Sequence, residues 1–280
     1  MSPRPDTVTG LRAESSLATI TLSWDPLGWD PLIDHFRIYA VPGDRTSVAP
    51  QESDLLAKSV YPCFVHEGLD PAGEQWTYLV LAVSDAGQRG KTSELVTATS
   101  QPSVTATGRE IATIGTFDGK SLEMQFSPSS YSSIPVEYPD ALIEYRQGTD
   151  QPESAWPYLL PGPGDAWAGR REYRARWTLT LDDHPSTDHD LALWLIDTTR
   201  LGGTLQINAN QQHVTDLDLP AGATRGSREG DATIPGSTLL RTFHEMPVPA
   251  AALQAGDNVI ELHMIAGGWI AWDAIGLFAR

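Results

Sequence analysis

The sequence predicts an all-β protein made of two sandwich units, one at residues 1–100 and a larger one at 101–280. Short apolar runs recur along the chain, separated by Gly, Pro and Asp turn residues about every 8–12 positions, which is typical of antiparallel sandwiches. No stretch carries a helical period of useful length. The 280 residues are enough for one or two domains with separate cores.

The strands of the first unit are predicted within residues 5–99. Residues 17–24 alternate, with Leu22 and Trp24 among the inward positions. A further strand is expected at 34–39, and residues 69–87 combine a turn with a long apolar strand. Residues 98–110 are small and polar, so they are either a short linker or in part the first strand of the second unit.

This first unit resembles a fibronectin type III domain. The resemblance rests on these residues in order: Trp24, Tyr39, Leu69, Pro71, Tyr78, Val80, Ala82 and the turn at Gly87. It implies a seven-stranded sandwich with Tyr78 at the tyrosine corner, and with Trp24, Tyr39 and Tyr78 packed in the core. It implies no function, because such modules serve as spacers, binders and connectors alike.

The second unit opens with a strand and a turn at 111–119, and residues 127–166 read as a long irregular loop. The predicted strands that follow are 173–181, 191–196, 204–210, 237–243, 258–265 and 269–278. Residues 249–256 read as a short helical turn ended by Gly256, and 209–236 as a long polar loop. About eight antiparallel strands without alternating helices predict a jelly-roll sandwich.

Composition excludes several classes of partner. The net charge is −17, with 36 Asp and Glu against 19 Lys and Arg, so the basic footprint of a nucleic-acid-binding protein is missing. The apolar runs are too short to span a bilayer. Cys63 is the single cysteine, which rules out an intramolecular disulfide and indicates a small hydrophobic residue rather than a nucleophile.

The stretch 156–170 is the strongest candidate for a binding site, because it is rich in Pro, Gly and aromatic residues and lies between apolar strands. Flat aromatic faces beside charged groups suit sugar rings. The predicted stacking residues are Trp156, Tyr158 and Trp167. The predicted partners of hydroxyls or of a uronate are Asp165, Arg170 and Arg171. The alternative is a loop held to the sandwich by buried tryptophans.

Other polar groups of the chain are weaker candidates for a functional site. Arg174 and Arg176 share one strand face, which is either a site for carboxylates or a solvated surface. The acidic run 182–190 lacks the spacing of a zinc or EF-hand site and reads as a turn. The chain holds no Gly-x-Ser-x-Gly elbow, no HExxH and no phosphate-binding Gly loop, so no catalytic residue is assigned.

The second unit is similar to the C-terminal, carbohydrate-binding-like domain of the rhamnogalacturonan lyases, polysaccharide lyase family 4. The matching segments are 114–115, 118–119, 156–157, 161–169, 195–198 with Asn208, 253–258 and 268–277. The family also places a fibronectin-like domain just before this one. Its catalytic sandwich has no counterpart here, which argues against lyase activity of this chain. Jelly-roll modules of this kind often hold a structural calcium, and the resemblance suggests Asp118 and Asp273 as its ligands.

These observations together predict a non-catalytic accessory region of a secreted, extracellular polysaccharide-degrading enzyme. It would bind or position a plant-type polysaccharide, with pectin as the first candidate, and would need no cofactor. The alternatives are the C-terminal part of a lyase whose catalytic domain lies upstream, an enzyme in its own right, and a purely structural pair of domains. We also expect the two units to share a buried interface that includes Trp29.

Overall fold

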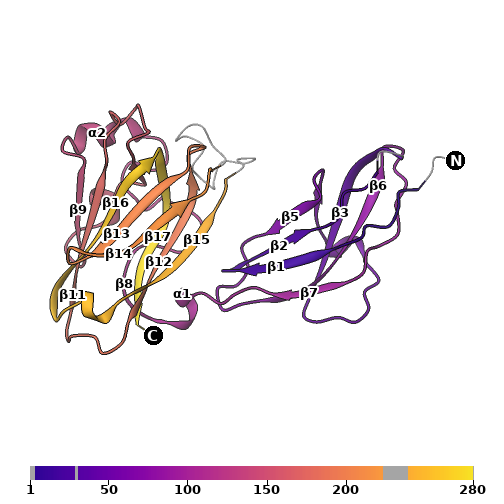
Figure 1. The fold of residues 1–280 in the computed structure, drawn as a ribbon, viewed down its shortest axis with the longest axis horizontal. Coiled ribbons are helices and arrows are strands. Elements are labelled where there is room, and N and C mark those ends of the chain that lie inside the picture. The colour runs from indigo at the N-terminus through magenta and orange to yellow at the C-terminus, as the bar shows by residue number, and fades with distance from the viewer. Residues whose placement is uncertain (1–3, 29–30, 223–238, 280) are drawn as a thin grey trace. The chain divides into compact units, whose positions relative to one another are not determined.

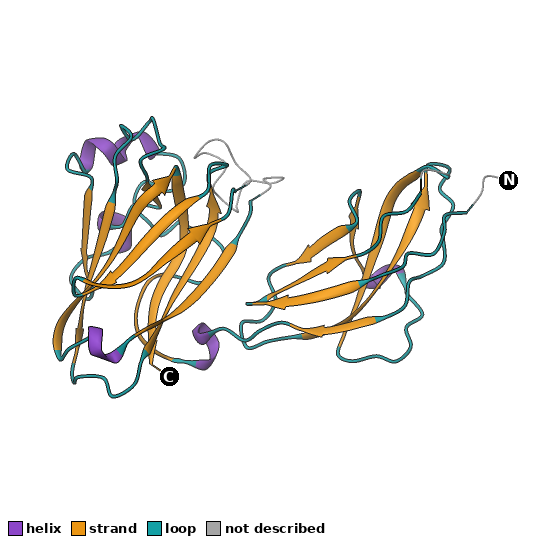
Figure 2. Cartoon of the chain, viewed as in Figure 1, coloured by secondary structure: helices purple, strands orange, loops and turns teal. Residues whose placement is uncertain are grey.

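The computed structural model describes residues 4–28, 31–222 and 239–279. The chain divides into two compact units, Met1–Thr107 and Gly108–Arg280 (Figure 1). Strands make up nearly all of the secondary structure in both units (Figure 2). The predicted all-β class, a fibronectin III-like sandwich followed by a jelly roll, is therefore confirmed. Trp29 lies outside the described residues.

The first unit pairs a three-stranded sheet with a four-stranded sheet, and all of its strand pairs are antiparallel. The first sheet has the order β1 (Arg12–Ser16), β2 (Thr19–Ser23), β5 (Cys63–His66). The second has the order β4 (Leu55–Ser59), β3 (Ile33–Pro42), β6 (Gln75–Ser84), β7 (Val96–Thr99). The 3₁₀ turn η1 (Glu52–Asp54) precedes β4.

The three aromatic residues that carry the fibronectin resemblance are all buried. Trp24 packs edge-on against Phe36 in the core between the sheets, with ring centroids 5.2 Å apart. Tyr78 lies in the same core, and its hydroxyl forms a 2.9 Å hydrogen bond with Nδ1 of His66 on β5. Tyr39 belongs instead to a second cluster, with Leu79 and two further residues of β6.

Residues 101–107 belong to the first unit, so the division lies seven positions beyond the predicted one. The Gln101 amide donates to the Ser16 carbonyl at 2.9 Å, and the Gln101 carbonyl accepts the Ala18 amide at 3.1 Å. These bonds hold the segment to the end of β1 and to the turn between β1 and β2. The single helical turn α1 (Val104–Thr107) ends the unit.

The second unit is a sandwich of two five-stranded sheets. One contains β10 (Leu159–Pro161), β17 (Trp269–Ala279), β12 (His189–Thr198) and β15 (Thr242–Val248) in that order, with β8 (Arg109–Gly115) also paired to β17. The other has the order β14 (Gln212–Leu219), β13 (Gly203–Ala209), β16 (Gly256–Gly267), β11 (Arg174–Leu181), β9 (Leu142–Arg146). The short helices are α2 (Ile134–Glu137), α3 (Pro152–Ala155), η2 (Tyr131–Ser133) and η4 (Ala250–Ala252).

The alternation seen in the sequence explains how the strands form the core of this unit. On β11, Ala175, Trp177 and Leu179 are buried while Arg174 and Thr180 are exposed.

Three predictions about the segments of the second unit were wrong. The segment predicted as the loop 127–166 contains β9 and β10, the polar segment 209–236 contains β14, and the strand expected at 237–243 lies at 242–248. These strands are short or polar, so pairing with a neighbour rather than periodicity determines them.

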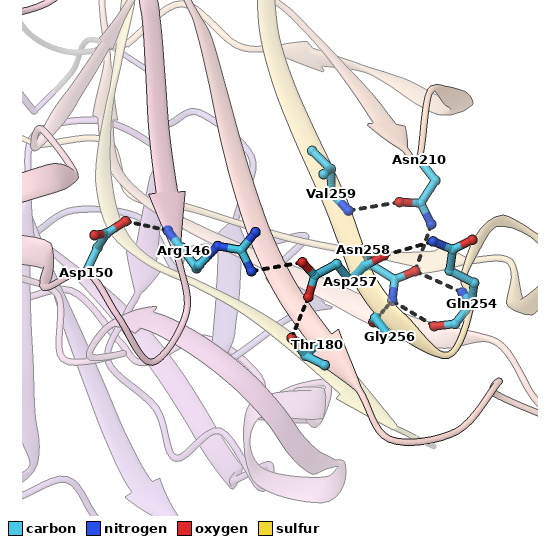
Figure 3. A network of polar contacts seen from close by, with 9 residues as sticks. All are labelled: Arg146, Asp150, Thr180, Asn210, Gln254, Gly256, Asp257, Asn258 and Val259. Carbon is cyan, nitrogen blue, oxygen red and sulfur yellow. Dashed lines mark hydrogen bonds and ion pairs between the residues drawn. The ribbon is translucent and has the colours of Figure 1, made fainter.

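Asn258, at the start of β16, is the centre of a buried polar network (Figure 3). Its Oδ1 accepts the Asn210 side-chain amide at 2.7 Å and the Gln254 backbone amide at 2.9 Å. Its Nδ2 donates to the carbonyls of Gln254 and Gly256 at 2.8 and 2.9 Å. The side chain is therefore fully satisfied, and it fixes the turn between η4 and β16 as a structural element.

Across the described part of the chain, none of the helices has the length and apolar character needed to cross a membrane.

Candidate functional site

The loop that links β10 to β11, residues 162–173, lies directly against the turn between β16 and β17. The amide of Gly162 donates to the carbonyl of Gly268, and the amide of Gly164 donates to the carbonyl of Gly267. A Cβ on Gly164 would lie only 2.6 Å from the Gly267 carbonyl oxygen, so this close approach requires glycine. The Pro-Gly-Pro-Gly run thus fixes the start of the loop on the sandwich.

The carboxylate of Asp165 holds the rest of the loop in place. Its Oδ1 accepts the Trp167 amide at 2.9 Å, and its Oδ2 accepts the hydroxyl of the buried Tyr131. The Asp165 carbonyl accepts the Arg170 amide at 2.8 Å. Burial and the hydrogen bond from the Tyr131 hydroxyl to the Asp165 carboxylate raise the pKa of Tyr131. Because Asp165 is buried and both of its carboxylate oxygens have protein partners, it positions the loop and is not placed to bind sugar hydroxyls as predicted.

Trp167 projects from this fixed loop with 83% of its surface exposed, more than any other large hydrophobic residue in the described ranges. Arg170 is also exposed, and its positive φ of 55° turns the chain at the end of the loop. Arg171 is exposed as well, but its guanidinium donates to the Pro139 carbonyl and so connects this loop to the segment after α2. Two of the predicted groups, Trp167 and Arg170, are therefore exposed, and neither side chain has a hydrogen-bond or ion-pair partner among the described residues.

Trp156 and Tyr158 are fully buried, so the prediction that they stack on sugar rings is wrong. The Trp156 ring packs against Trp272 of β17, with centroids 5.7 Å apart, and edge-on against Tyr145 of β9 at 5.9 Å. The Tyr158 carbonyl accepts the Trp272 amide at 3.0 Å. Trp156 and Tyr158 thus agree with the alternative hypothesis for this stretch, in which buried aromatic residues hold the loop to the sandwich.

The paired arginines of β11 lie on its outer face, as the alternation predicts. Arg176 donates to Glu261 on the neighbouring β16 at 2.7 Å, where the two residues are in register, and Arg174 is exposed. On this face, opposite charges are thus paired across neighbouring strands.

Among the described residues, no group of three or more His, Cys, Asp or Glu side chains could hold a metal, and this includes the acidic run 182–190.

The residues suggested as calcium ligands form a turn contact instead. Asp273 is buried, and its Oδ1 accepts the amides of Gly119 and Lys120 at 2.7 and 3.0 Å. Burial, the largest cause, raises the pKa of Asp273 to about 7. Oδ1 of Asp118 accepts the Lys120 amide, and its Oδ2 lies 3.9 Å from the Lys120 ammonium. With only Oδ2 of Asp273 unpartnered, these two carboxylates do not fit calcium, which takes about 6–8 oxygen ligands.

The sequence does not indicate the roles of two further residues of this region, Tyr131 and Leu201. Tyr131 lies in a segment read as irregular, and nothing in its spacing indicates that it meets Asp165. Leu201 lies in the turn between β12 and β13 and is 68% exposed. The Gly202-Gly203 pair marks that turn in the sequence, but it does not indicate what lies beside it.

Residues 110–277 match a family model described as "CBM-like: Polysaccharide lyase family 4, domain III", which covers more than half of the chain. No curated protein sequence matches the chain.

Several solved structures resemble parts of the chain. The twitchin kinase region from C. elegans is 28% identical over 36% of this chain and 17% of its own, with a TM-score of 0.29. The fibronectin type-III domain of human fibronectin type III domain containing protein 3 is 15% identical over 38% of this chain and 95% of its own, with a TM-score of 0.29. A family 35 carbohydrate binding module from an environmental isolate is 14% identical over 39% of this chain and 66% of its own, with a TM-score of 0.27. The chain thus spans less than two thirds of the first and third of these proteins.

Proposed function

The chain belongs to the CBM-like domain III family of polysaccharide lyase family 4, and we propose that it is a non-catalytic accessory region that binds a plant-type polysaccharide. Pectic polymers are the first candidates, because they are the substrates of the lyases that the second unit resembles. In this proposal the second unit carries the binding surface. The first unit serves as a spacer, the role in which fibronectin-like modules often act.

The exposed side chain of Trp167 carries the proposal. The indole of Trp167 is 83% exposed, so a ligand that covers it removes a large apolar surface from water. This burial of apolar surface favours binding. The loop is already fixed by Gly164 and Asp165, so little conformational entropy is lost when a ligand binds. A rigid, flat and exposed aromatic ring suits the apolar face of a sugar ring.

Arg170 adds a charge preference to the same loop. It is exposed three residues from Trp167, and no ion pair to it is found among the described residues. A guanidinium group forms strong paired hydrogen bonds with a carboxylate. An acidic polysaccharide such as a polygalacturonate would use both groups, whereas a neutral polymer would use the indole alone. The net charge of −17 makes this local cation more important for an anionic ligand.

The wider context in this proposal is an extracellular polysaccharide-degrading enzyme. A binding region of this kind would hold a catalytic domain close to its polymer and raise the effective concentration. Two other roles remain as hypotheses: the C-terminal part of a lyase with its catalytic domain upstream, and a structural pair of domains that packs on such a domain. The exposed Trp167 favours a binding role over the purely structural one.

Affinity electrophoresis of the whole chain tests the proposal, with gels that contain polygalacturonate, rhamnogalacturonan, galactan, arabinan or xylan. We expect retardation by at least one pectic polymer and its loss in Trp167→Ala. Tyr61→Ala is the matched control, because Tyr61 is a 68% exposed aromatic residue of the first unit. Unchanged mobility of the wild-type chain in every gel would overturn the proposed function.

A further inference from the structure

Leu201 lies beside the loop that presents Trp167. Its Cδ1 is 3.2 Å from the position that a Cβ on Gly164 would occupy, so the leucine packs against the backbone of the loop. The side chain nevertheless remains 68% exposed. A second large apolar group is therefore open to solvent at the end of the sandwich that carries Trp167.

The turn of Leu201 is as firmly held as the loop of Trp167. The Leu201 amide donates to Oγ1 of Thr199 at 3.3 Å, and the Gly202 amide donates to the Thr199 carbonyl at 2.9 Å. Gly202 has a φ of +60°, and a Cβ there would lie 2.7 Å from the Leu219 carbonyl oxygen. The Gly202 carbonyl accepts the amide of Gly268, the residue whose own carbonyl accepts the Gly162 amide. Both segments are thus fixed to one turn.

The two exposed side chains lie within reach of one ligand. Trp167 follows Gly164 by three residues, and three residues of extended chain span at most about 11 Å. Because Leu201 touches the Gly164 position, the separation of its side chain from the Trp167 backbone cannot exceed that span by more than one atomic contact. We call these two exposed residues, Trp167 and Leu201, the apolar platform, and Arg170 lies on the same loop as Trp167.

We infer that this platform binds an interior stretch of a polysaccharide chain, with Trp167 and Leu201 contacting successive sugar rings, and that it does not select chain ends. The inference rests on the proposed function. A chain end differs from the interior by the terminal hydroxyl of its last ring, and recognising that group requires enclosing polar groups that would be unpaired without it. Trp167 and Leu201 are instead exposed apolar groups, and an apolar contact with a ring face is the same for an interior ring as for a terminal one.

Calorimetric titration of the whole chain tests the inference with polygalacturonate, rhamnogalacturonan, and oligosaccharides of each from the disaccharide to the dodecasaccharide. We expect affinity to rise with oligosaccharide length until both contacts are covered. Chemical reduction of the reducing end should leave the affinity of the long oligosaccharides unchanged. Leu201→Ala should weaken binding of the long oligosaccharides about tenfold and that of the disaccharide far less.

Three variants make the result interpretable. Leu201→Phe keeps an apolar contact and should retain wild-type affinity, whereas Leu201→Ala should not. Leu32→Ala removes a leucine that is 54% exposed on the first unit and should change nothing. A disaccharide that binds as tightly as the polymer, or a loss of binding on end reduction, would overturn the inference and leave the proposed function standing. If the wild-type chain binds none of these glycans, the proposed function itself fails.

Discussion

The buried carboxylate of Asp165 accepts the hydroxyl of Tyr131 and so joins two loops that are 34 residues apart in the sequence. The same carboxylate holds the amide of Trp167 through its other oxygen. The position of the exposed indole therefore depends on a tyrosine that never meets the ligand in our proposal.

Tyr131→Phe tests this dependence. The variant removes the donor and leaves a buried carboxylate oxygen without its partner, which should lower the free energy of unfolding by about 1–3 kcal/mol. Glycan affinity should fall, but less than in Trp167→Ala, because the indole itself remains. Tyr138→Phe is the control, since the Tyr138 hydroxyl donates to Gln125 rather than to Asp165. Equal glycan affinities of the Tyr131→Phe and wild-type chains would show that Tyr131 does not position Trp167.

Trp167→Ala and Trp156→Ala should have opposite effects, although both residues lie in one stretch. Trp167 is exposed, so its removal should change the free energy of unfolding by no more than about 0.5 kcal/mol while glycan retardation is lost. Trp156 is fully buried against Trp272, so its removal should cost roughly 3–5 kcal/mol. Denaturant unfolding and affinity electrophoresis of the two variants measure both effects. A strongly destabilised Trp167→Ala chain would contradict our assignment.

Asn258→Ala should destabilise the second unit through the network of Figure 3. The change removes four hydrogen bonds of a fully buried amide and leaves groups of Gln254 and Asn210 without partners, a loss of about 2–4 kcal/mol. Asp257→Ala, one position earlier, removes half-exposed contacts to Arg146 and Thr180 and should destabilise the unit far less, because solvent screens exposed ion pairs. Thermal unfolding checks the contrast, and similar losses in both variants would argue against a special role for Asn258.

The first unit should lose stability when the pH falls below the ordinary histidine pKa of about 6.5. Burial lowers the pKa of His66 in the folded chain, so below that pH the unfolded chain binds a proton that the folded chain does not. The loss should level off once the pH drops below the lowered pKa. Hydrogen exchange of the β5 and β6 amides in the whole chain would report it. His66→Leu should reduce this dependence, and an unchanged pH profile in that variant would exclude His66 as its source.

Calcium should not change the melting temperature of the second unit. Asp118 and Asp273 have one carboxylate oxygen between them that lacks a partner, so an added ion would have to displace existing hydrogen bonds. Calorimetry with calcium and with a chelator measures this directly. A rise of several degrees in melting temperature with calcium would contradict this prediction and support Asp118 and Asp273 as ligands.

The all-β class and the inward positions of the regular strands could be predicted from the sequence. A strand alternates its side chains between two faces, so Ala175 and Trp177 on β11 could be assigned to the core and Arg174 and Arg176 to the outer face from spacing alone. The order of aromatic residues in the first unit likewise predicted that Trp24, Tyr39 and Tyr78 would be buried. The strand faces follow from local periodicity, which needs no knowledge of distant partners, whereas the burial of the three aromatic residues is what the fibronectin resemblance implies.

Which side chains of the stretch 156–170 face outward depends on long-range packing and could not be predicted from the sequence. A loop rich in Pro and Gly has no period, so Trp156 and Trp167 look alike in the sequence. Trp272, more than a hundred residues later, buries the first, while Asp165 and Tyr131 hold the loop so that the second stays exposed. The contact of Leu201 with Gly164 could not be predicted from the sequence for the same reason. Long-range packing, not local pattern, sets the exposure of a loop residue.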